Sequence, residues 1–110
     1  MTELHFLPSA RTELRSARRY YRQKDAEVAR RFSSEVLKLL QRIVEAPSQF
    51  PEHGLLAVPN RLQTLYFTVR KAVLPRTFPF VILYYVSQGA VIVLAVAHDR
   101  RRPGYWTHRG

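Results

Sequence analysis

The sequence predicts an α+β fold in which an N-terminal strand and a pair of helices precede a mainly antiparallel sheet. Two patterns support this prediction. Between residues 9 and 46, apolar side chains recur every three or four positions, which is the period of an α-helix. From residue 65 onward the period is two, and only short turns separate the apolar runs. Such runs indicate antiparallel strands within one domain (residues 1–110), with the helices packed on one face of the sheet.

The first expected elements are a short strand and a helix. Residues 4–7 predict the strand, which ends at Pro8. Ser9 is the expected N-cap of the helix, with Glu13 in its first turn. Two stripes follow the helix side by side: an apolar one (Ala10, Leu14, Ala17, Tyr21) and an arginine one (Arg11, Arg15, Arg18, Arg22). Like charges at this spacing repel one another, so the arginine stripe is either a solvated face or a binding surface for an acidic partner.

A second helix is expected to begin at the N-cap Asp25 and to end at Glu45, before Pro47. Its apolar stripe is formed by Val28, Ala29, Phe32, Val36, Leu39, Leu40 and Ile43. Glu27 and Arg31 lie four positions apart and are expected to form an ion pair on the exposed face. Two helices joined by so short a turn predict an antiparallel helical hairpin.

Residues 47–60 contain three prolines and a glycine, so we expect a loop there. Strands are predicted at residues 65–73, 78–86 and 91–97, with a turn at 75–77 and a hairpin loop at 87–90. The last two strands are apolar on both faces, whereas a sheet with one solvated face alternates. Two helices cover only one face, so the segment of Tyr105 and Trp106, or a partner protein, is expected to shield part of the other.

Composition excludes several classes of protein. The chain has no cysteine, which excludes a disulfide scaffold and a thiolate metal site and fits a cytoplasmic protein. We expect no signal peptide and no membrane-spanning helix. No Gly-rich phosphate loop or catalytic carboxylate pair is apparent, and the histidines are too scattered for a metal site, so no cofactor is expected. These histidines are His5, His53, His98 and His108.

The net charge of +10 arises from 18 basic and 8 acidic side chains. A charge of this size attracts nucleic acid, an acidic protein surface or anionic lipid. Most of the basic residues are arginines, and the guanidinium group binds phosphate or carboxylate in a bidentate manner. The composition therefore favours the first two classes of partner.

The chain ends in a segment rich in side chains that bind, stack or transfer protons. In order, these are His98, Asp99, Arg100, Arg101, Arg102, Tyr105, Trp106, His108 and Arg109. His98 directly follows the apolar strand 91–97, so a rigid scaffold can position the segment. Adjacent residues on a strand point to opposite faces, so we do not expect His98 and Asp99 to form a catalytic pair.

Three sequence phrases resemble the RelE/ParE family of bacterial toxins. They are Ala10-x-x-x-Leu14 with Tyr20-Tyr21 and Ala29-x-x-Phe32; Phe78-Pro79-Phe80-x-Ile82-x-Tyr84, with Phe80 in place of the usual Tyr; and Val93-Leu94-Ala95-Val96-Ala97-His98-x-Arg100-Arg101-x-Pro103-x-Tyr105-Trp106-x-x-Arg109. The third phrase is the most specific, because it combines a strand, His, an Arg pair, Pro, Tyr-Trp and Arg in a fixed order. The resemblance covers nearly the whole chain and is closer to ParE than to RelE.

The resemblance implies the toxin of a type II toxin–antitoxin pair, neutralised by a ParD-like antitoxin whose often acidic segment folds over it. ParE-like members inhibit DNA gyrase through protein contact, whereas RelE-like members cut messenger RNA in the ribosome without a metal. The predicted sheet is poor in inward basic residues, which favours gyrase as the target. Ribosome-dependent ribonuclease activity is the alternative, so enzyme activity stays open. A non-catalytic basic nucleic-acid-binding module is a third hypothesis.

Three groups of site residues follow from these hypotheses. For a ribonuclease, the catalytic candidates are Arg70, Lys71, His98, Arg101 and Tyr105, with Arg76 nearby in sequence. The expected target-binding residues are Arg100, Arg101, Arg102, Tyr105, Trp106 and Arg109. The expected antitoxin-binding residues are Arg11, Arg15, Arg18, Arg22, Tyr84 and Tyr85.

Overall fold

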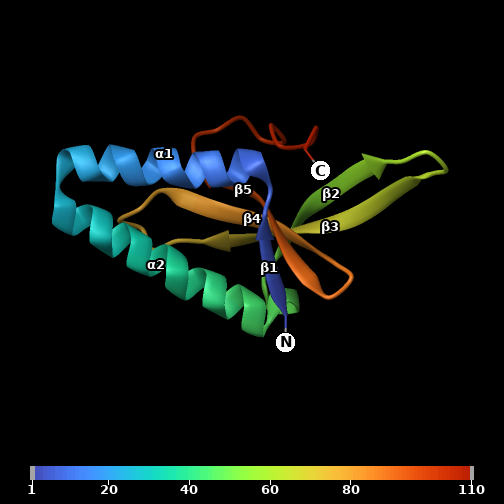
Figure 1. Cartoon of the computed structure of the whole chain (residues 1–110), viewed down its shortest axis with the longest axis horizontal. Helices are drawn as coiled ribbons and strands as arrows, with labels where there is room; N and C mark the ends of the chain where they lie inside the picture. The colour runs from blue at the N-terminus through green and yellow to red at the C-terminus, as the bar shows by residue number, and fades with distance from the viewer. Residues whose placement is uncertain (1, 110) are drawn as a thin grey trace.

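The computed structural model describes residues 2–109 and has the expected α+β architecture (Figure 1). The elements in chain order are β1 (Glu3–Phe6), α1 (Pro8–Lys24), α2 (Ala26–Glu45), the 3-10 helix η1 (Pro47–Gln49), β2 (Glu52–Pro59), β3 (Thr64–Val73), β4 (Phe80–Ser87) and β5 (Ala90–His98). A tail of turns follows β5. The five strands form one sheet in the order β1-β5-β4-β3-β2.

The helical hairpin agrees with the sequence prediction apart from two local features. α1 begins at Pro8 and has no side-chain cap, so Ser9 is not the N-cap. Proline suits the first helical position because it lacks an N–H and its φ is already helical. Glu13 consequently lies beyond the first turn. Asp25 caps α2 as expected, by accepting a hydrogen bond from the Glu27 N–H at 2.7 Å.

The ion pair expected between Glu27 and Arg31 is replaced by one between Glu27 and Arg30. Both spacings place two side chains on neighbouring positions of a helix surface, so the choice rests on local rotamers. Each partner is more than 60% exposed, so the exchange has little effect on stability.

The sheet is mixed, because β1 pairs parallel with β5 while all other neighbours are antiparallel. β4 begins at Phe80, two residues later than predicted, and β5 spans Ala90–His98. The turn between them consists of Gln88 and Gly89, with φ angles of 50° and 78°. Positive φ at both positions matches the twist of an antiparallel hairpin, which accounts for glycine at the second.

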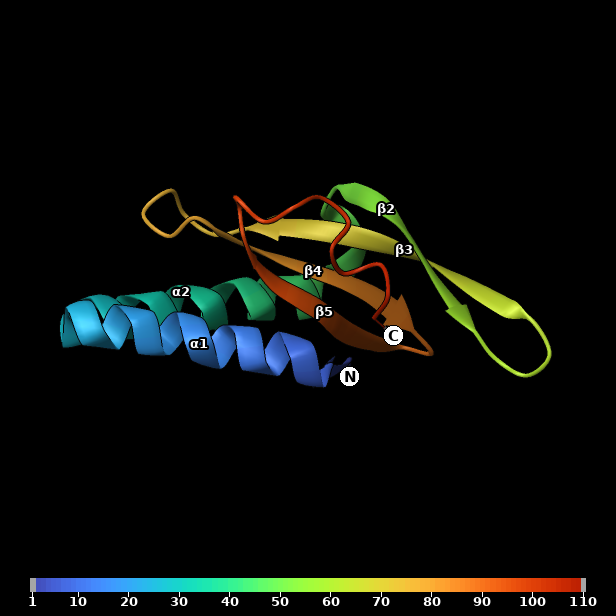
Figure 2. The same cartoon turned by 90° about the horizontal axis from the view of Figure 1, so that it is seen from above.

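The prediction of a loop over residues 47–60 is wrong for most of that segment, because β2 occupies Glu52–Pro59. β2 is an edge strand, so Pro59 at its end removes no hydrogen bond that the sheet needs. Gly54 has φ +134° and marks an irregularity in the pairing with β3. The hairpin of β2 and β3 extends away from the body of the molecule (Figures 1 and 2).

Apolar side chains are buried on both faces of the sheet. The helices cover one face, and the C-terminal tail crosses the other (Figure 2). Phe32, Ile43 and Tyr84 are central to the helix-side core. Leu83, Leu94 and Trp106 belong to the tail-side core. The expectation that the tail shields the face opposite the helices is therefore confirmed.

Candidate functional site

Glu13 joins the C-terminal tail to helix α1 and strand β5. Its carboxylate accepts hydrogen bonds from the Tyr105 hydroxyl at 2.6 Å and the Val96 N–H at 3.0 Å. Two nitrogens of the Arg109 guanidinium donate to it at 2.8 and 3.1 Å. Arg109 also donates to the carbonyl oxygen of Leu94 at 3.1 Å. The side chains of Glu13 and Arg109 are only 19% and 17% exposed, so water screens this ion pair weakly.

These contacts shift the ionisation of two groups in the tail. Burial, followed by the hydrogen bond to Glu13 and its charge, raises the pKa of Tyr105 well above its usual value. The hydrogen bond to Glu13 is the main cause that raises the pKa of Arg109. The phenol therefore stays protonated, and the guanidinium charged, at neutral pH.

Trp106 anchors the tail to the sheet and is only 4% exposed. It packs with Leu56, Leu83 and Leu94. A Cβ atom at Gly54 would lie 3.7 Å from the Trp106 ring, so the indole packs closely against β2. The indole of Trp106 is thus a packing anchor in this structure, and its role in target binding stays a prediction.

His98 lies at the end of β5, where the chain leaves the sheet. Its ring is 5.2 Å from the Phe80 ring in an edge-on arrangement. Nδ1 of His98 lies 3.1 Å from the backbone nitrogen of Arg100 and 3.2 Å from Oδ1 of Asp99. Nδ1 can accept from the Arg100 N–H only when unprotonated, and it can donate to Asp99 only when protonated.

The expectation that His98 and Asp99 point to opposite faces is wrong at this position. The alternation of side chains applies within a strand, and β5 ends at His98. Asp99 is the first residue of the turn after β5, which allows its carboxylate to approach the ring. The contact is a local one at the start of the tail, and it is an ion pair only when the imidazole is protonated.

Four of the five catalytic candidates gather at one small pocket between the sheet and the tail. The pocket has a volume of about 160 Å³ and is lined by Lys71, His98, Arg101 and Tyr105, with His53 and Arg102 among its other residues. The Arg101 guanidinium lies over the Tyr105 ring at 4.2 Å. The sequence did not single out His53, because an exposed histidine in a predicted loop gave no signal.

Arg70, the fifth candidate, points to the other face of the sheet. It neighbours Lys71 on β3, and successive strand residues alternate. Its guanidinium donates to the Phe50 carbonyl oxygen at 2.7 Å and lies 4.0 Å from a carboxylate oxygen of Glu52. Arg70 is thus not part of the tail-side pocket, and Arg76 lies in the exposed turn before β4.

A larger pocket of about 690 Å³ lies between α1 and the ends of β4 and β5. Tyr20, Tyr21 and Phe80 give it mostly apolar walls, and Glu13 contributes from α1. His98 and Arg101 line both this pocket and the smaller one.

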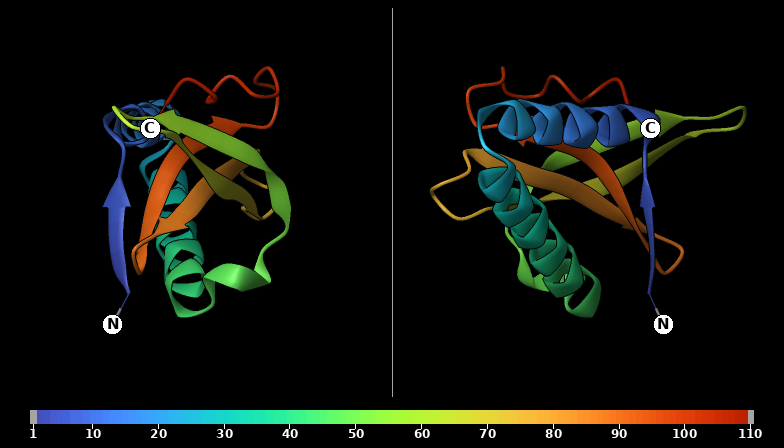
Figure 3. Two further views of the ribbon diagram at one scale, coloured as in Figure 1. Left: turned by 90° about the vertical axis from the view of Figure 1, so that its right-hand side faces the viewer. Right: turned by 60° about the vertical axis from the view of Figure 1, so that its left-hand side comes forward.

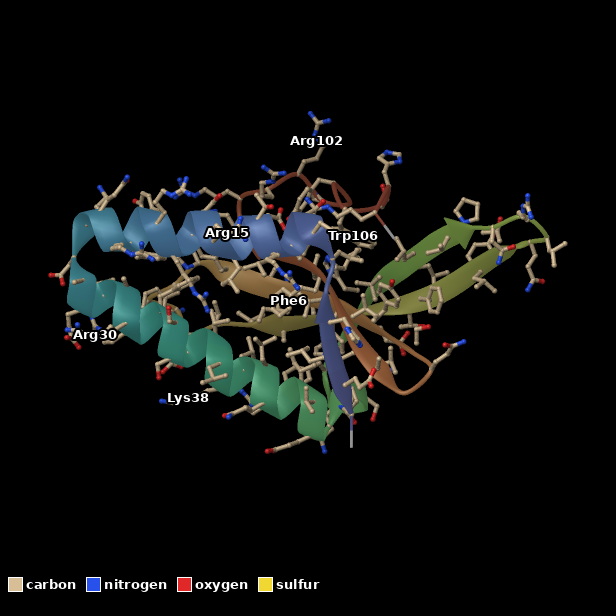
Figure 4. The ribbon with its side chains drawn as sticks, viewed as in Figure 1. Phe6, Arg15, Arg30, Lys38, Arg102 and Trp106 are labelled. Carbon is tan, nitrogen blue, oxygen red and sulfur yellow. The ribbon has the colours of Figure 1, made fainter. Side chains whose placement is uncertain are left out.

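Three of the four residues of the arginine stripe line a groove beside strand β1. Arg11, Arg15 and Arg18 form its wall with Phe6 and Leu14, whereas Arg22 lies beyond it. Figure 4 shows Arg15 on α1 and Phe6 at the end of β1. The Nε of Arg18 is buried and has no hydrogen-bond partner within residues 2–109. The far edge of β1 is unpaired, because β1 is the first strand of the sheet.

Tyr84 and Tyr85 do not belong to this surface. Tyr84 is 0% exposed, and its hydroxyl donates to the Pro47 carbonyl oxygen in the helix-side core. Tyr85 is 8% exposed and stacks near Phe67 in the tail-side core. Both side chains are buried because the apolar strand β4 lies inside the sheet, with a core on each face, and their role in antitoxin binding stays a prediction.

Within residues 2–109, no group of His, Asp or Glu side chains has an arrangement suited to a metal ion. No helix in the same range is long and apolar enough to cross a membrane.

The model of the family "ParE toxin of type II toxin-antitoxin system, parDE" matches residues 4–103 of this chain. Among solved structures, the chain is similar to one titled "Chromosomal ParDE TA system from P. aeruginosa". The TM-score is 0.63 at 17% identity, and the alignment covers 89% of this chain and 96% of that one, which supports the shared fold. No curated protein sequence matches the chain. Because the family model spans nearly the whole sequence and the fold agrees, this chain belongs to the ParE toxins of type II toxin–antitoxin systems.

Proposed function

We propose that this toxin inhibits DNA gyrase through protein contact and that a ParD-like antitoxin neutralises it. Membership of the ParE family supports the choice of target. The main observation behind the proposal is that some residues of the tail attach it to the body of the protein while others are exposed to solvent. Tyr105, Trp106 and Arg109 hold the tail to the body, while Arg100, Arg101 and Arg102 stay exposed.

The three consecutive arginines suit an acidic protein surface. Their guanidinium groups make no ion pair within the described residues, so their charge is free for a partner. Figure 4 shows the Arg102 side chain pointing away from the body of the molecule. A rigid tail lowers the entropy lost when such side chains bind.

A DNA supercoiling assay with purified toxin tests the target. We expect inhibition and a trapped cleavage complex with the unaltered chain, and loss of both when Arg100, Arg101 and Arg102 are all replaced by Gln. A variant with Arg19, Arg31 and Arg61 replaced by Gln has the same net charge and is expected to inhibit normally. Unchanged supercoiling at micromolar unaltered toxin, with no cleavage complex, would reject gyrase as the target.

The groove formed by Arg11, Arg15, Arg18, Phe6 and Leu14 is the surface that we propose for the antitoxin. It offers cations above an apolar floor, which suits a segment with alternating carboxylates and apolar side chains. The unpaired edge of β1 lies beside it and allows such a segment to add a strand.

Ribosome-dependent ribonuclease activity is the second candidate function. The gathering of Lys71, His98, Arg101 and Tyr105 at one pocket favours it, because cations and a proton-transfer group are what phosphodiester cleavage needs. The bond from Tyr105 to Glu13 disfavours it, since a phenol held protonated is a poor base. Cutting of ribosome-bound message, abolished by His98→Ala or by Tyr105→Phe in a folded protein, would establish it.

A further inference from the structure

The small pocket between the sheet and the tail brings together basic side chains from separate parts of the chain. Lys71 comes from β3, His98 from the end of β5, and Arg101 from the tail. The views in Figures 2 and 3 show the tail running back over the sheet on the face opposite the helices. The pocket therefore exists only when the tail is docked.

The positive charge at this pocket is not compensated within residues 2–109. Lys71 and Arg101 each lack an ion-pair partner there. Asp99 is the one carboxylate among the described lining residues, and it lies against His98. Cations that share a partly enclosed site repel one another, and a bound anion removes that repulsion.

The guanidinium of Arg101 is positioned before any ligand arrives. It lies 4.2 Å from the centre of the Tyr105 ring, and the Tyr105 hydroxyl is bonded to Glu13 at 2.6 Å. The Arg101 N–H donates to the His98 carbonyl oxygen at 3.0 Å, which fixes the backbone of the turn. A preorganised donor loses little entropy when it binds.

We propose that this pocket binds a phosphodiester group of a nucleic-acid strand through Lys71 and Arg101, with Arg102 reaching an adjacent phosphate from the rim. A volume of about 160 Å³ is smaller than pockets for whole small-molecule ligands, which measure roughly 300–1,000 Å³. It suits one compact anionic group at the end of two cationic side chains. Backbone phosphate gives affinity without base readout.

The choice of DNA as the source of the phosphate rests on the proposed gyrase inhibition. Gyrase holds a DNA segment, and in a toxin docked on the enzyme through Arg100 the neighbouring Arg101 and Arg102 remain at the pocket to bind that DNA. The phosphate chemistry itself does not depend on gyrase, so it is tested on the isolated toxin.

The experiment measures fluorescence anisotropy of a short single-stranded oligonucleotide, in a DNA and an RNA form of one sequence, on addition of toxin. We expect the double variant Lys71→Gln/Arg101→Gln to bind DNA at least tenfold more weakly and to have a smaller salt dependence. The variant Arg19→Gln/Arg31→Gln loses the same charge on the exposed faces of α1 and α2 and is expected to change affinity less than threefold. Urea unfolding of each variant confirms that the fold is kept.

Titration with inorganic phosphate, followed through backbone amide shifts, locates the site. Shifts confined to the tail and to the neighbouring ends of β3 and β5 support the pocket, whereas shifts along the arginine stripe of α1 overturn it. Equal loss of DNA binding in the two double variants also overturns it, because the effect is then net charge alone. Binding of the RNA oligonucleotide but not of the DNA oligonucleotide rejects DNA as the source of the phosphate group.

Gyrase and oligonucleotide-binding assays on the same protein samples distinguish a failure of the phosphate site from a failure of the gyrase proposal. Gyrase inhibition by a toxin that binds no oligonucleotide overturns the phosphate site and leaves the gyrase proposal standing. Oligonucleotide binding that depends on Lys71 and Arg101, without any effect on gyrase, supports the site and rejects the gyrase target.

Discussion

The hydroxyl of Tyr105 lies 2.6 Å from Oε2 of Glu13, which ties the last turn of the chain to its first helix. The two residues are 92 positions apart in sequence. Through this bond and the Arg109 ion pair, the tail becomes part of the folded core. The placement of Arg101 and of the pocket behind the tail depends on it.

Replacement of Glu13 by Ala is expected to destabilise the protein by about 3 kcal/mol, because it leaves the mostly buried Arg109 without its anion. The Val96 N–H and the Tyr105 hydroxyl lose their acceptor as well. Urea unfolding measures the change. Glu35→Ala is the control, since its surface ion pair with Lys38 is worth under about 1 kcal/mol. Equal costs for the two variants would contradict the role of Glu13.

Stability is expected to fall as the pH rises above 10. Burial raises the pKa of Tyr84 from its ordinary value of 10.0 to about 12, and it raises the pKa of Tyr105 in the same direction. A raised folded-state pKa means that, above pH 10, the unfolded chain has released a proton that the folded chain still holds. The stabilisation is complete below pH 10 and is lost as the pH rises through the folded-state value.

Thermal unfolding between pH 8 and 12, with tyrosinate absorbance as a second signal, measures this dependence. Glu13 raises the pKa of Tyr105 further, whereas Arg109 and Arg101 lower it. Tyr105→Phe removes one of the titrating groups and is expected to flatten the loss of stability. A profile identical to that of the unaltered chain would mean that Tyr105 ionises as freely as in the unfolded state.

Trp106→Ala is expected to cost about 3–5 kcal/mol, because it empties a site in the tail-side core where the indole is 4% exposed. Trp106→Phe keeps a ring there and should cost less. The indole is the single tryptophan of the chain, so its fluorescence reports docking of the tail. In the Glu13→Ala variant we expect the emission to shift to the red before global unfolding. An unchanged emission up to global unfolding would show that the tail stays docked without Glu13.

Arg15→Ala is expected to weaken binding of the cognate antitoxin about tenfold, or about 1.4 kcal/mol, and to reduce its salt dependence. Arg15 lines the groove beside β1, whereas Arg31 is exposed on α2 and is not part of that groove. Isothermal titration calorimetry of Arg15→Ala and Arg31→Ala separates a specific contact from net charge. Equal weakening in both variants would exclude the groove as the binding surface.

The helices and β3 were predictable because each buries a face with its own period, whereas β4 and β5 were predictable as apolar runs bounded by turns. The segment 47–60, predicted as a loop, shows where local sequence pattern is insufficient. Its prolines signal interruption, yet β2 is an edge strand in which Pro59 and the bulge at Gly54 are tolerated. Sequence pattern does not distinguish an edge strand from a loop, because the position of a strand in the sheet is a tertiary property.

The candidate site was likewise predictable only in part from the sequence. The basic aromatic tail was evident from its residue types, but their roles were not. Tyr84 and Trp106 look like binding residues in sequence and are buried, since aromatic side chains serve both purposes equally well. Glu13 gave little signal, because one carboxylate in an arginine-rich helix resembles a surface residue.

By itself, the sequence determined the helical hairpin, the apolar strands, the excess of positive charge and the need to cover a second sheet face. These properties follow from local periodicity and composition, which reflect burial residue by residue. Only the tertiary structure decided that Glu13 meets Arg109 and that Lys71 shares a pocket with Arg101. These contacts depend on the order of the strands and on the path of the tail. They join residues far apart in the chain and therefore leave no local pattern in the sequence.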